Sequence, residues 1–258
     1  MGEHTTIAWC HHTFNMVEGC AKVSAGCEHC YAWKRDRRLH RGKHWGQGAE
    51  RKTMSAAYWK QPHKWNRLAL LDEERPRVFC SSLADVFEDH PTNNAERSRL
   101  WELIRSTPNL DWLLLSKRPE NFACFLPDDW GEGYANVWLG VTAEDQENAD
   151  RRIPILTRTP ARVRFISAEP LLERVTFGRL LAGIDWVIVG GESESAENAR
   201  ACEPEWMRAI IAECRGAGVA PFMKQLGTVL ARRWGCRHPK GEDPLEWPAD
   251  LRVREMPR

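Results

Sequence analysis

Three cysteines near the amino-terminal end are arranged as the ligands of a metal centre would be. Cys20, Cys27 and Cys30 stand at the spacing C-x6-C-x2-C, and Gly19 and Gly26 each precede one of them. Glycine lets the backbone bend tightly around whatever the thiolates hold. A closed structural zinc site takes four protein ligands, whereas iron–sulfur clusters are held by cysteine thiolates. Three cysteines would leave one iron of such a cluster open to a further ligand.

A fourth ligand close in sequence would change that interpretation. If Cys10 or His29 completes a tetrahedral site with the three cysteines, the region is a closed zinc module. A buried thiol is the commoner role for a cysteine in the position of Cys10. The adjacent pair His11 and His12 is more typical of a solvated turn than of a site. The sequence by itself leaves both kinds of metal centre open.

Length and composition limit the class of protein. The chain has 258 residues and a formal charge of +1, so no global field favours a polyanionic partner. Its nine cysteines are scattered and odd in number, and neither a signal peptide nor an apolar run of about 18 residues is present. We expect a cytoplasmic chain with reduced thiols and no membrane association.

The elements that must position the cysteines follow in a regular alternation. Six short apolar runs of strand length are bounded by turn residues: 77–81, 110–116, 136–141, 161–167, 184–189 and 219–223. Helical patterns cover 31–39, 95–105, 146–156 and 205–217, and Gly178–Leu181 has the length of a short helix. Residues 5–9 read as a short first strand. This alternation predicts βαβ units and a parallel sheet, either open or closed into a barrel.

Polar residues follow every one of the six predicted strands. In parallel α/β folds the active site lies on the loops after the carboxyl ends of the strands, so these residues are site candidates. The alternative is that strand ends simply meet solvent or cap a helix. The candidates are Ser81, Ser82, Asp85, Ser116, Lys117, Arg118, Thr142, Glu144, Ser167, Glu169, Gly191, Glu192, Lys224 and Gln225.

A basic segment rich in tryptophan spans residues 33–67. Gly42, Gly46 and Gly48 predict a loop in its middle, so we interpret the segment as an insertion rather than a core element. Lysine and arginine neutralise phosphates and aromatic faces stack on unpaired bases, which suits a nucleic-acid partner. The equally weighted alternative is a solvated basic segment. The residues with the binding role are Arg35, Arg37, Arg38 and Trp45.

Taken together, several motifs resemble the phage-type three-cysteine-motif family, a radical S-adenosylmethionine-like group. The resemblance runs from Ile7 to Gln225 and returns at 247–257. It departs from the commonest radical S-adenosylmethionine pattern, because six residues separate the first two cysteines and His29 precedes the last one. Tyr31 then takes the aromatic role. The motifs are the cysteine loop, 115–120, 138–141, 167–172, 187–193 and 222–225.

The resemblance implies a fold and a set of cofactors. The fold is a partial parallel (β/α)6-type barrel over 1–226, with the 33–67 insertion and an irregular extension, 227–258, packed on the barrel. Cys20, Cys27 and Cys30 would hold a [4Fe–4S] cluster whose open iron binds S-adenosylmethionine. An electron donor such as flavodoxin or ferredoxin would reduce the cluster, and a phage-encoded chain would act in the host cytoplasm.

The resemblance also implies roles for the strand-end residues. Ser81, Ser82 and Asp85 would hold the methionine ammonium, and Lys117 or Arg118 would pair with its carboxylate. Glu144 and Glu169 would bind ribose hydroxyls, with Tyr31, Ser116, Thr142 and Ser167 lining the same cofactor site. The residues expected to face substrate are Arg118, Gly191, Glu192, Lys224 and Gln225.

The implied activity is formation of a 5′-deoxyadenosyl radical that abstracts hydrogen from a substrate. We expect a nucleic-acid base or nucleotide, in DNA or RNA, while a free metabolite stays open. The competing function is a non-enzymatic zinc protein that binds nucleic acid. A P-loop or dinucleotide enzyme is excluded on motifs, because no G-x-x-x-x-G-K-[ST] occurs and no G-x-G-x-x-G opens a helix.

Overall fold

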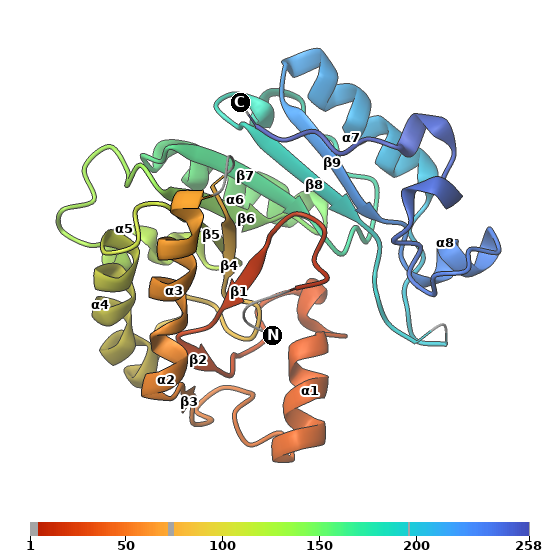
Figure 1. Cartoon of the computed structure of the whole chain (residues 1–258). Coiled ribbons are helices and arrows are strands. Elements are labelled where there is room, and N and C mark those ends of the chain that lie inside the picture. Colours follow the sequence, from red (N-terminus) through yellow and green to blue (C-terminus); the bar gives the residue numbers. More distant parts are fainter. Residues whose placement is uncertain (1–4, 72–74, 196, 258) are drawn as a thin grey trace. The chain divides into compact units, whose positions relative to one another are not determined.

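The computed structural model of the chain describes residues 5–71, 75–195 and 197–257 (Figure 1). Seven strands form one parallel sheet in the order β1-β4-β5-β6-β7-β8-β9. Because helices follow most of these strands along the chain, the sheet has the βαβ connections of a partial barrel. The predicted α/β class and partial parallel barrel are therefore confirmed.

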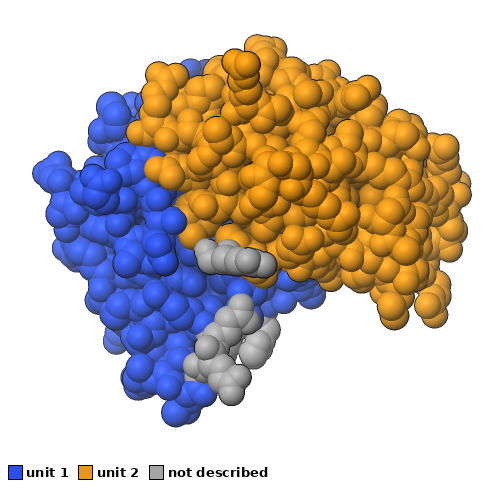
Figure 2. Space-filling model, turned by 90° about the horizontal axis from the view of Figure 1, so that it is seen from above, with its two compact units in different colours: residues 1–140, 159–162 blue, residues 141–158, 163–258 orange. Residues whose placement is uncertain are grey.

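The chain divides into two compact units, shown in blue and orange in Figure 2. Unit 1 contains Met1–Gly140 and Thr159–Arg162, and unit 2 contains Val141–Arg158 and Val163–Arg258. The strand β6 (Val137–Thr142) begins in unit 1 and ends in unit 2. The division into residues 1–226 and 227–258 stays a prediction about domains, and its first four and last residues lie outside the described part.

Unit 1 holds the amino-terminal strands and the helices that follow them. Its larger helices are α1 (Tyr31–His40), α3 (Gln61–Leu68) and α4 (Pro91–Arg105), and its sheet strands are β1 (His12–Phe14), β4 (Arg77–Cys80) and β5 (Asp111–Ser116). The shorter elements are β2 (Val17–Glu18), β3 (Lys52–Thr53), α2 (Ala56–Trp59) and α5 (Phe122–Phe125), with 3-10 turns at Ala25–Cys27, Ala69–Leu71 and Pro119–Asn121.

The first strand lies later in the chain than the sequence predicts. Residues 5–9 form no strand, and β1 pairs with β4 instead, with Thr13 opposite Phe79. The prediction of a strand over 5–9 is therefore wrong. Thr13 and Phe14 are fully buried, so the short strand β1 is covered by other residues although it stands first in the strand order.

The second half of the basic insertion is part of the core, which corrects the interpretation of 33–67 as an element outside it. The ring centroids of Phe14 and Trp59 are 5.0 Å apart, and His12 stacks on Trp65 at 4.3 Å. Trp59 and Trp65 are almost completely buried. Burying the large aromatic rings is favourable, and the neighbouring lysines can keep their charged ends in water. The helices α2 and α3 therefore pack beside β1 (Figure 1). The middle of the insertion is a loop, as predicted.

Unit 2 holds the later βα repeats. Its strands are β7 (Val163–Ala168), β8 (Trp186–Gly190) and β9 (Ala220–Gln225). Figure 1 shows α7 running along β8 and β9, and Gly218, which has φ +72°, ends that helix. The helices are α6 (Gln146–Arg158), α7 (Pro204–Ala217) and α8 (Thr228–Arg233), with 3-10 turns at Gly178–Leu181, Pro244–Glu246 and Ala249–Leu251.

The carboxyl-terminal segment covers the exposed edge of β9. The amide of Met223 donates to the carbonyl of Val253 at 2.7 Å, and the amide of Glu255 donates to the carbonyl of Pro221 at 3.0 Å. An open strand edge invites pairing with another chain, so this cover protects the sheet. Apart from the short helix α8 and two 3-10 turns, the segment is irregular.

From residue 31 onward, the predicted helices and the six predicted strands agree with the structure to within a few residues. The largest of these differences is at α4, which starts at Pro91 rather than at 95, because the His90 side chain accepts from the Thr92 amide and caps the helix. The thiols of Cys80 and Cys214, expected in the core, are fully buried. None of the helices in the described part is both long and hydrophobic enough to span a bilayer.

Candidate metal centre

The three cysteines of the motif lie on one loop of unit 1, between β2 and α1. Cys20 pairs with Trp45 in an isolated bridge, Cys27 ends a 3-10 turn, and Cys30 is the N-cap residue of α1. All three are free thiols and half-buried. The three cysteines therefore lie in three different local structures: a bridge, a 3-10 turn and the start of a helix.

The environment of the sulfurs combines burial with positive charge. Burial raises the pKa of the Cys20 thiol to about 12, and the Arg118 guanidinium only partly offsets this effect. Burial also raises the pKa of Cys30, against the first amides of α1 and the charge of Lys117. A metal ion binds the thiolate, so binding must release these protons.

Arg118 connects the cysteine loop to the end of β5. Its Nη1 donates to Cys20 Sγ at 3.5 Å and to Asp85 Oδ2 at 3.0 Å. Its Nη2 donates to the Ala21 carbonyl at 2.8 Å and to Glu88 Oε1 at 3.3 Å. The guanidinium is almost fully buried, so a planar fork holds the backbone beside Cys20 and places a charge on its sulfur.

Glu88 is the centre of this buried charge cluster. Its carboxylate accepts two hydrogen bonds from Arg51, at 2.8 and 3.0 Å, and one from the Ala21 amide at 2.9 Å. Arg51 also donates to the carbonyls of His44, Gly46 and Ala49. Glu88 therefore ties the loop of the basic insertion to the residue that follows Cys20. We call Arg51, Asp85, Glu88 and Arg118 the charge frame.

The backbone fits tightly on the other side of Cys20. Gly19 has φ +122°, and a Cβ atom built there would lie 2.2 Å from the carbonyl oxygen of His44. No side chain fits without moving the backbone, so only glycine allows the loop and the insertion to approach this closely.

The carboxylate of Asp85 is hydrogen-bonded to several neighbouring groups of the protein. Its oxygens accept from the Ser116 hydroxyl at 2.8 Å, from the Lys117 and Phe87 amides at 3.0 Å, and from Arg118. The structure thus brings Asp85, Ser116 and Arg118 together, as their strand-end positions predict. Their contacts serve to orient the Cys20 arm, and the expected contacts of Asp85 with an ammonium and of Arg118 with substrate stay predictions.

Two serines and a tyrosine lie on the Cys30 side. The Tyr31 hydroxyl donates to the Ser82 carbonyl at 2.5 Å, which anchors the start of α1 to the loop after β4. The side-chain nitrogen Nδ2 of Asn15 donates to the Ser82 hydroxyl at 3.2 Å. The Ser81 hydroxyl lies 3.4 Å from the buried Cys80 thiol. Both serines are buried. The loop after β4 therefore meets the cysteine loop at Tyr31.

In unit 2, Glu144 forms a completely buried ion pair. Its Oε2 lies 2.7 Å from Nη1 of Arg152, which also donates to the Thr142 carbonyl at 2.8 Å. Both side chains have no solvent exposure. This pairing places Glu144 against the helix α6, and its predicted ribose contact stays a prediction.

Glu169 lies over the end of β8. Its Oε1 is 3.0 Å from Nζ of Lys224, and its Oε2 accepts from the Ser167 hydroxyl at 3.4 Å. A Cβ atom at Gly190 would lie 2.4 Å from Glu169 Oε1, so glycine makes room for the carboxylate. Glu169 and Lys224 keep some solvent exposure. Unlike the Glu144 pair, this one is partly exposed to solvent.

The last predicted substrate residues form two local contacts. Glu192 accepts from the Nε and the amide of Arg200, at 3.0 and 2.8 Å. The side-chain nitrogen of Gln225 donates to the Gly191 carbonyl at 3.0 Å and to the Ser193 hydroxyl at 2.5 Å. The structure brings Gly191 and Gln225 together, and it gives Glu192 a partner that the sequence did not suggest.

The basic residues of α1 divide into one structural and two exposed arginines. Arg35 donates to Glu18 at 2.9 Å, whereas Arg37 and Arg38 are exposed. The guanidinium of Arg37 lies over the Trp33 ring at 5.7 Å, and Lys22 lies over the same ring at 5.1 Å. Trp45 is half-buried against Cys20. The exposed cations of α1 thus follow directly on the cysteine loop in sequence and in space.

The donor set fits a cluster better than a single zinc ion. Four ligands at about 2.3 Å on a tetrahedral zinc stand about 3.8 Å from one another. Among the described residues, the three sulfurs form no group within 4.8 Å of one another, with or without a histidine or a carboxylate. Irons between the sulfurs allow wider separations, and Arg118, Lys117 and the amino end of α1 supply positive charge for an anionic cluster.

Sequence reasoning missed the residues that hold the loop. Arg51 and Glu88 were not named as site residues, although Glu88 follows Asp85 by three positions in the same strand-end segment. Asn15, whose side chain accepts from the Leu83 amide at 2.6 Å, is likewise absent from the predicted site residues. The available signal was an Asp-x-x-Glu pair beside a predicted strand end, but nothing in the sequence identifies its arginine partners.

Solved structures of spore photoproduct lyase share the fold. The complex with dinucleoside spore photoproduct has a TM-score of 0.50 at 10% sequence identity, covering 83% of this chain and 63% of that one. A mutant in which one cysteine is replaced by serine has a TM-score of 0.49 at 11% identity and coverage of 73% and 58%. A double mutant with bound AdoMet and the same dinucleoside has a TM-score of 0.47 at 12% identity, with coverage of 82% and 65%.

The chain thus spans about three fifths of the length of the lyases it matches. At this low identity the likeness shows the fold, a partial parallel barrel, and nothing of the chemistry. No curated protein matches the sequence. One family model, described as "Protein of unknown function (DUF5131)", matches residues 4–245, so the chain belongs to the DUF5131 family.

Proposed function

We propose that this protein is a radical S-adenosylmethionine enzyme of the phage-type three-cysteine-motif group, acting on a nucleic-acid base or nucleotide. Cys20, Cys27 and Cys30 would hold a [4Fe–4S] cluster. The observation that carries the proposal is the charge frame, which clamps a three-cysteine loop and sets a guanidinium on Cys20 Sγ.

Bound together, the cluster and S-adenosylmethionine would supply one-electron chemistry that yields a 5′-deoxyadenosyl radical for hydrogen abstraction. The chain's own residues would orient the cluster and the methionine end. Lys117, whose charge acts on Cys30, is the cation that we assign to the methionine carboxylate. We do not assign that role to Arg118, because its guanidinium already pairs with Asp85 and Glu88 and binds the cysteine loop. Flavodoxin or ferredoxin is the class of electron donor we expect.

The proposed substrate class is supported by two observations. Arg37 and Lys22 flank the Trp33 ring close to the cysteine loop, a combination of charge and aromatic face that suits a phosphate-bearing base. The solved lyase with the TM-score of 0.50 is complexed with a dinucleoside. Because that likeness is one of fold, the substrate remains a proposal about this chain.

The test of the activity begins with protein purified without oxygen. We expect about four irons and four sulfides per chain after reconstitution, and 5′-deoxyadenosine when S-adenosylmethionine and a reductant are added. Cys27→Ala should lose both, whereas Cys124→Ala removes an exposed cysteine outside the motif and should retain both. A colourless wild-type protein holding one zinc, with no deoxyadenosine formed, would contradict the proposal.

The substrate class has a separate test. We expect binding to single-stranded DNA or RNA that weakens as salt increases, because phosphate contacts release counterions. The variant Arg37→Gln/Arg38→Gln should bind more weakly and show a slope against log salt smaller by about 1.4, since each phosphate contact on a single strand contributes about 0.7. Arg232→Gln/Arg233→Gln changes two cations of α8 as a matched control. Equal binding by both double variants would exclude α1 as the contact surface.

A further inference from the structure

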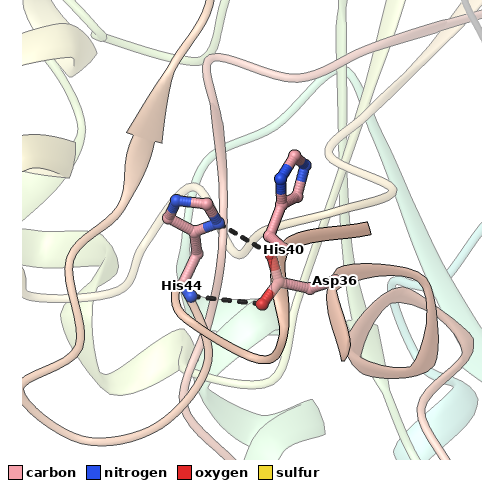
Figure 3. Close-up of side chains that lie close together, drawn as sticks. All are labelled: Asp36, His40 and His44. Carbon is pink, nitrogen blue, oxygen red and sulfur yellow. Dashed lines mark hydrogen bonds and ion pairs between the residues drawn. The ribbon is translucent and has the colours of Figure 1, made fainter. Parts of the chain in front are cut away.

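A second group of metal-ligating side chains lies in unit 1, apart from the cysteines. Asp36, His40 and His44 lie close together and each offers one ligand atom, and these atoms lie within 4.8 Å of one another (Figure 3). The group contains no cysteine, and the proposed cluster does not use it. Two imidazole nitrogens and one carboxylate oxygen are a ligand set that divalent transition metals take in proteins.

The fold brings these three residues together by a specific turn. Asp36 and His40 are four residues apart on α1, so they share one face of the helix. Arg41 then adopts a left-handed conformation with φ 57°, which ends the helix and reverses the chain. The reversal returns His44 to Asp36, where its amide donates to Oδ2 at 3.1 Å and its Nδ1 lies 2.7 Å from Oδ1.

The surroundings are those of a buried ligand shell. Asp36 and His44 are 3% and 8% exposed, so neither is an ordinary surface residue. The Oε2 atom of Glu18 lies 3.6 Å from Nε2 of His40, and Arg35 and Lys52 hold Glu18 in place. With Nδ1 of His40 on a metal ion, Glu18 would lie beside its other nitrogen, and a carboxylate in that place is the usual outer partner of a metal-bound imidazole. Lys52 Nζ also lies 3.5 Å from that nitrogen.

We propose that Asp36, His40 and His44 bind one divalent transition-metal ion of the zinc class, with water completing its coordination. The ion would replace the short contact between Asp36 and His44 by two metal bonds and would recruit His40 from the helix end. It would stiffen the turn that carries Trp45 and Gly46, whose amide donates to the Cys20 carbonyl at 2.9 Å. The proposal does not depend on the enzymatic function.

The test removes the cysteine site and measures the second one directly. In the full chain with Cys20, Cys27 and Cys30 all changed to serine, stripped with a chelator, we titrate Co²⁺ and record visible absorption, then compete it with Zn²⁺. One Co²⁺ per chain should bind with the d–d bands of nitrogen and oxygen ligation. His40→Ala should weaken binding about 100-fold or more, and Glu18→Gln about 10- to 100-fold.

The controls keep the result interpretable. His63→Ala removes an exposed histidine of α3 and should leave the affinity unchanged. His40 is partly exposed, so His40→Ala should fold normally, which circular dichroism checks. If the triple serine variant fails to fold, the wild-type chain is titrated, because thiolate ligation adds near-ultraviolet charge-transfer bands that the second site lacks. Absence of Co²⁺ binding, or unchanged affinity in His40→Ala, would overturn the proposal and leave only a loop-closing hydrogen bond.

Discussion

The acidic residues that follow the strands of unit 1 share a cationic partner with one another, unlike those in the described part of unit 2. In unit 1, Asp85 and Glu88 join a frame in which Arg51 and Arg118 come from distant segments and Cys20 is included. In unit 2, Glu144, Glu169 and Glu192 form ion pairs with Arg152, Lys224 and Arg200, respectively. A frame that joins residues from distant segments fixes a loop in one geometry, whereas each of these pairs joins residues of unit 2 only.

The contrast separates the strand-end residues that are bound into the frame from Glu169 and Lys224, whose ion pair keeps some exposure. Removing one partner from a buried charge network leaves an uncompensated charge, so such a network holds its residues in one arrangement. The Glu169–Lys224 pair is partly exposed to solvent, whereas the charges of the frame are buried. Four sets of variants would show whether the two units differ in this way.

Glu88→Ala should have the largest effect, because it leaves Arg51 and Arg118 without their shared carboxylate. We expect the free energy of unfolding to fall by an amount toward the upper end of about 3–5 kcal/mol, and iron incorporation to be lost. Urea denaturation and iron analysis measure the two effects. Glu50→Ala, which removes the exposed partner of Lys43, is the control and should match the wild type. Normal iron content in Glu88→Ala would show that the frame does not position Cys20.

Arg152→Met should destabilise unit 2 by about 3 kcal/mol, because Glu144 keeps a buried charge without its partner. Removing both charges, as Arg152→Met/Glu144→Gln, should restore most of that loss, since the ion pair is then removed as a whole. The same denaturation experiment tests both variants. If the double variant is no more stable than the single one, Glu144 belongs to a network after all, and the two units would not differ as described.

Arg118→Lys should keep the charge but lose the planar fork to Asp85, Glu88 and the Ala21 carbonyl. We expect about 1.5–3 kcal/mol of lost stability, the value of a charged hydrogen bond, and lower iron content at equal protein. Arg67→Lys, at an exposed position of α3, is a conservative change outside the frame and serves as the control. A variant with full iron content would show that charge alone is enough at Cys20.

Without metal, the wild-type protein should lose stability as the pH rises into the alkaline range, and Cys20→Ser should lose less. Burial raises the thiol pKa to about 12 from its ordinary value of 9.0, so between these values the folded state binds more protons than the unfolded one. This stabilisation is complete below pH 9 and is lost as pH rises, at up to about 1.4 kcal/mol per pH unit. Unfolding midpoints of both proteins from about pH 8 to about pH 10 measure the difference. Parallel curves would mean that the thiol ionises freely.

Much of the fold could be predicted because its signals are local. The runs that became β4 to β9 are bounded by turn residues, and the patterns that became α4, α6 and α7 have helical spacing. The exceptions have physical reasons. The strand expected at 5–9 lies at His12–Phe14, and Trp59 and Trp65 enter the core although their segment is basic. Short strands and mixed segments depend on which partners the fold provides.

The sequence alone is enough to specify the three-cysteine motif, the glycine beside Cys20 and the order of strands and helices, because these features depend on residues close together along the chain. The roles of the acidic residues come from the folded arrangement instead: Asp85 binds Arg118 beside the cysteine loop, while Glu169 forms a partly exposed ion pair with Lys224. The partners of Cys20 and Glu88 are 98 and 37 residues away, at Arg118 and Arg51. Ion pairs depend on distance in space and on burial, and residue types alone record neither.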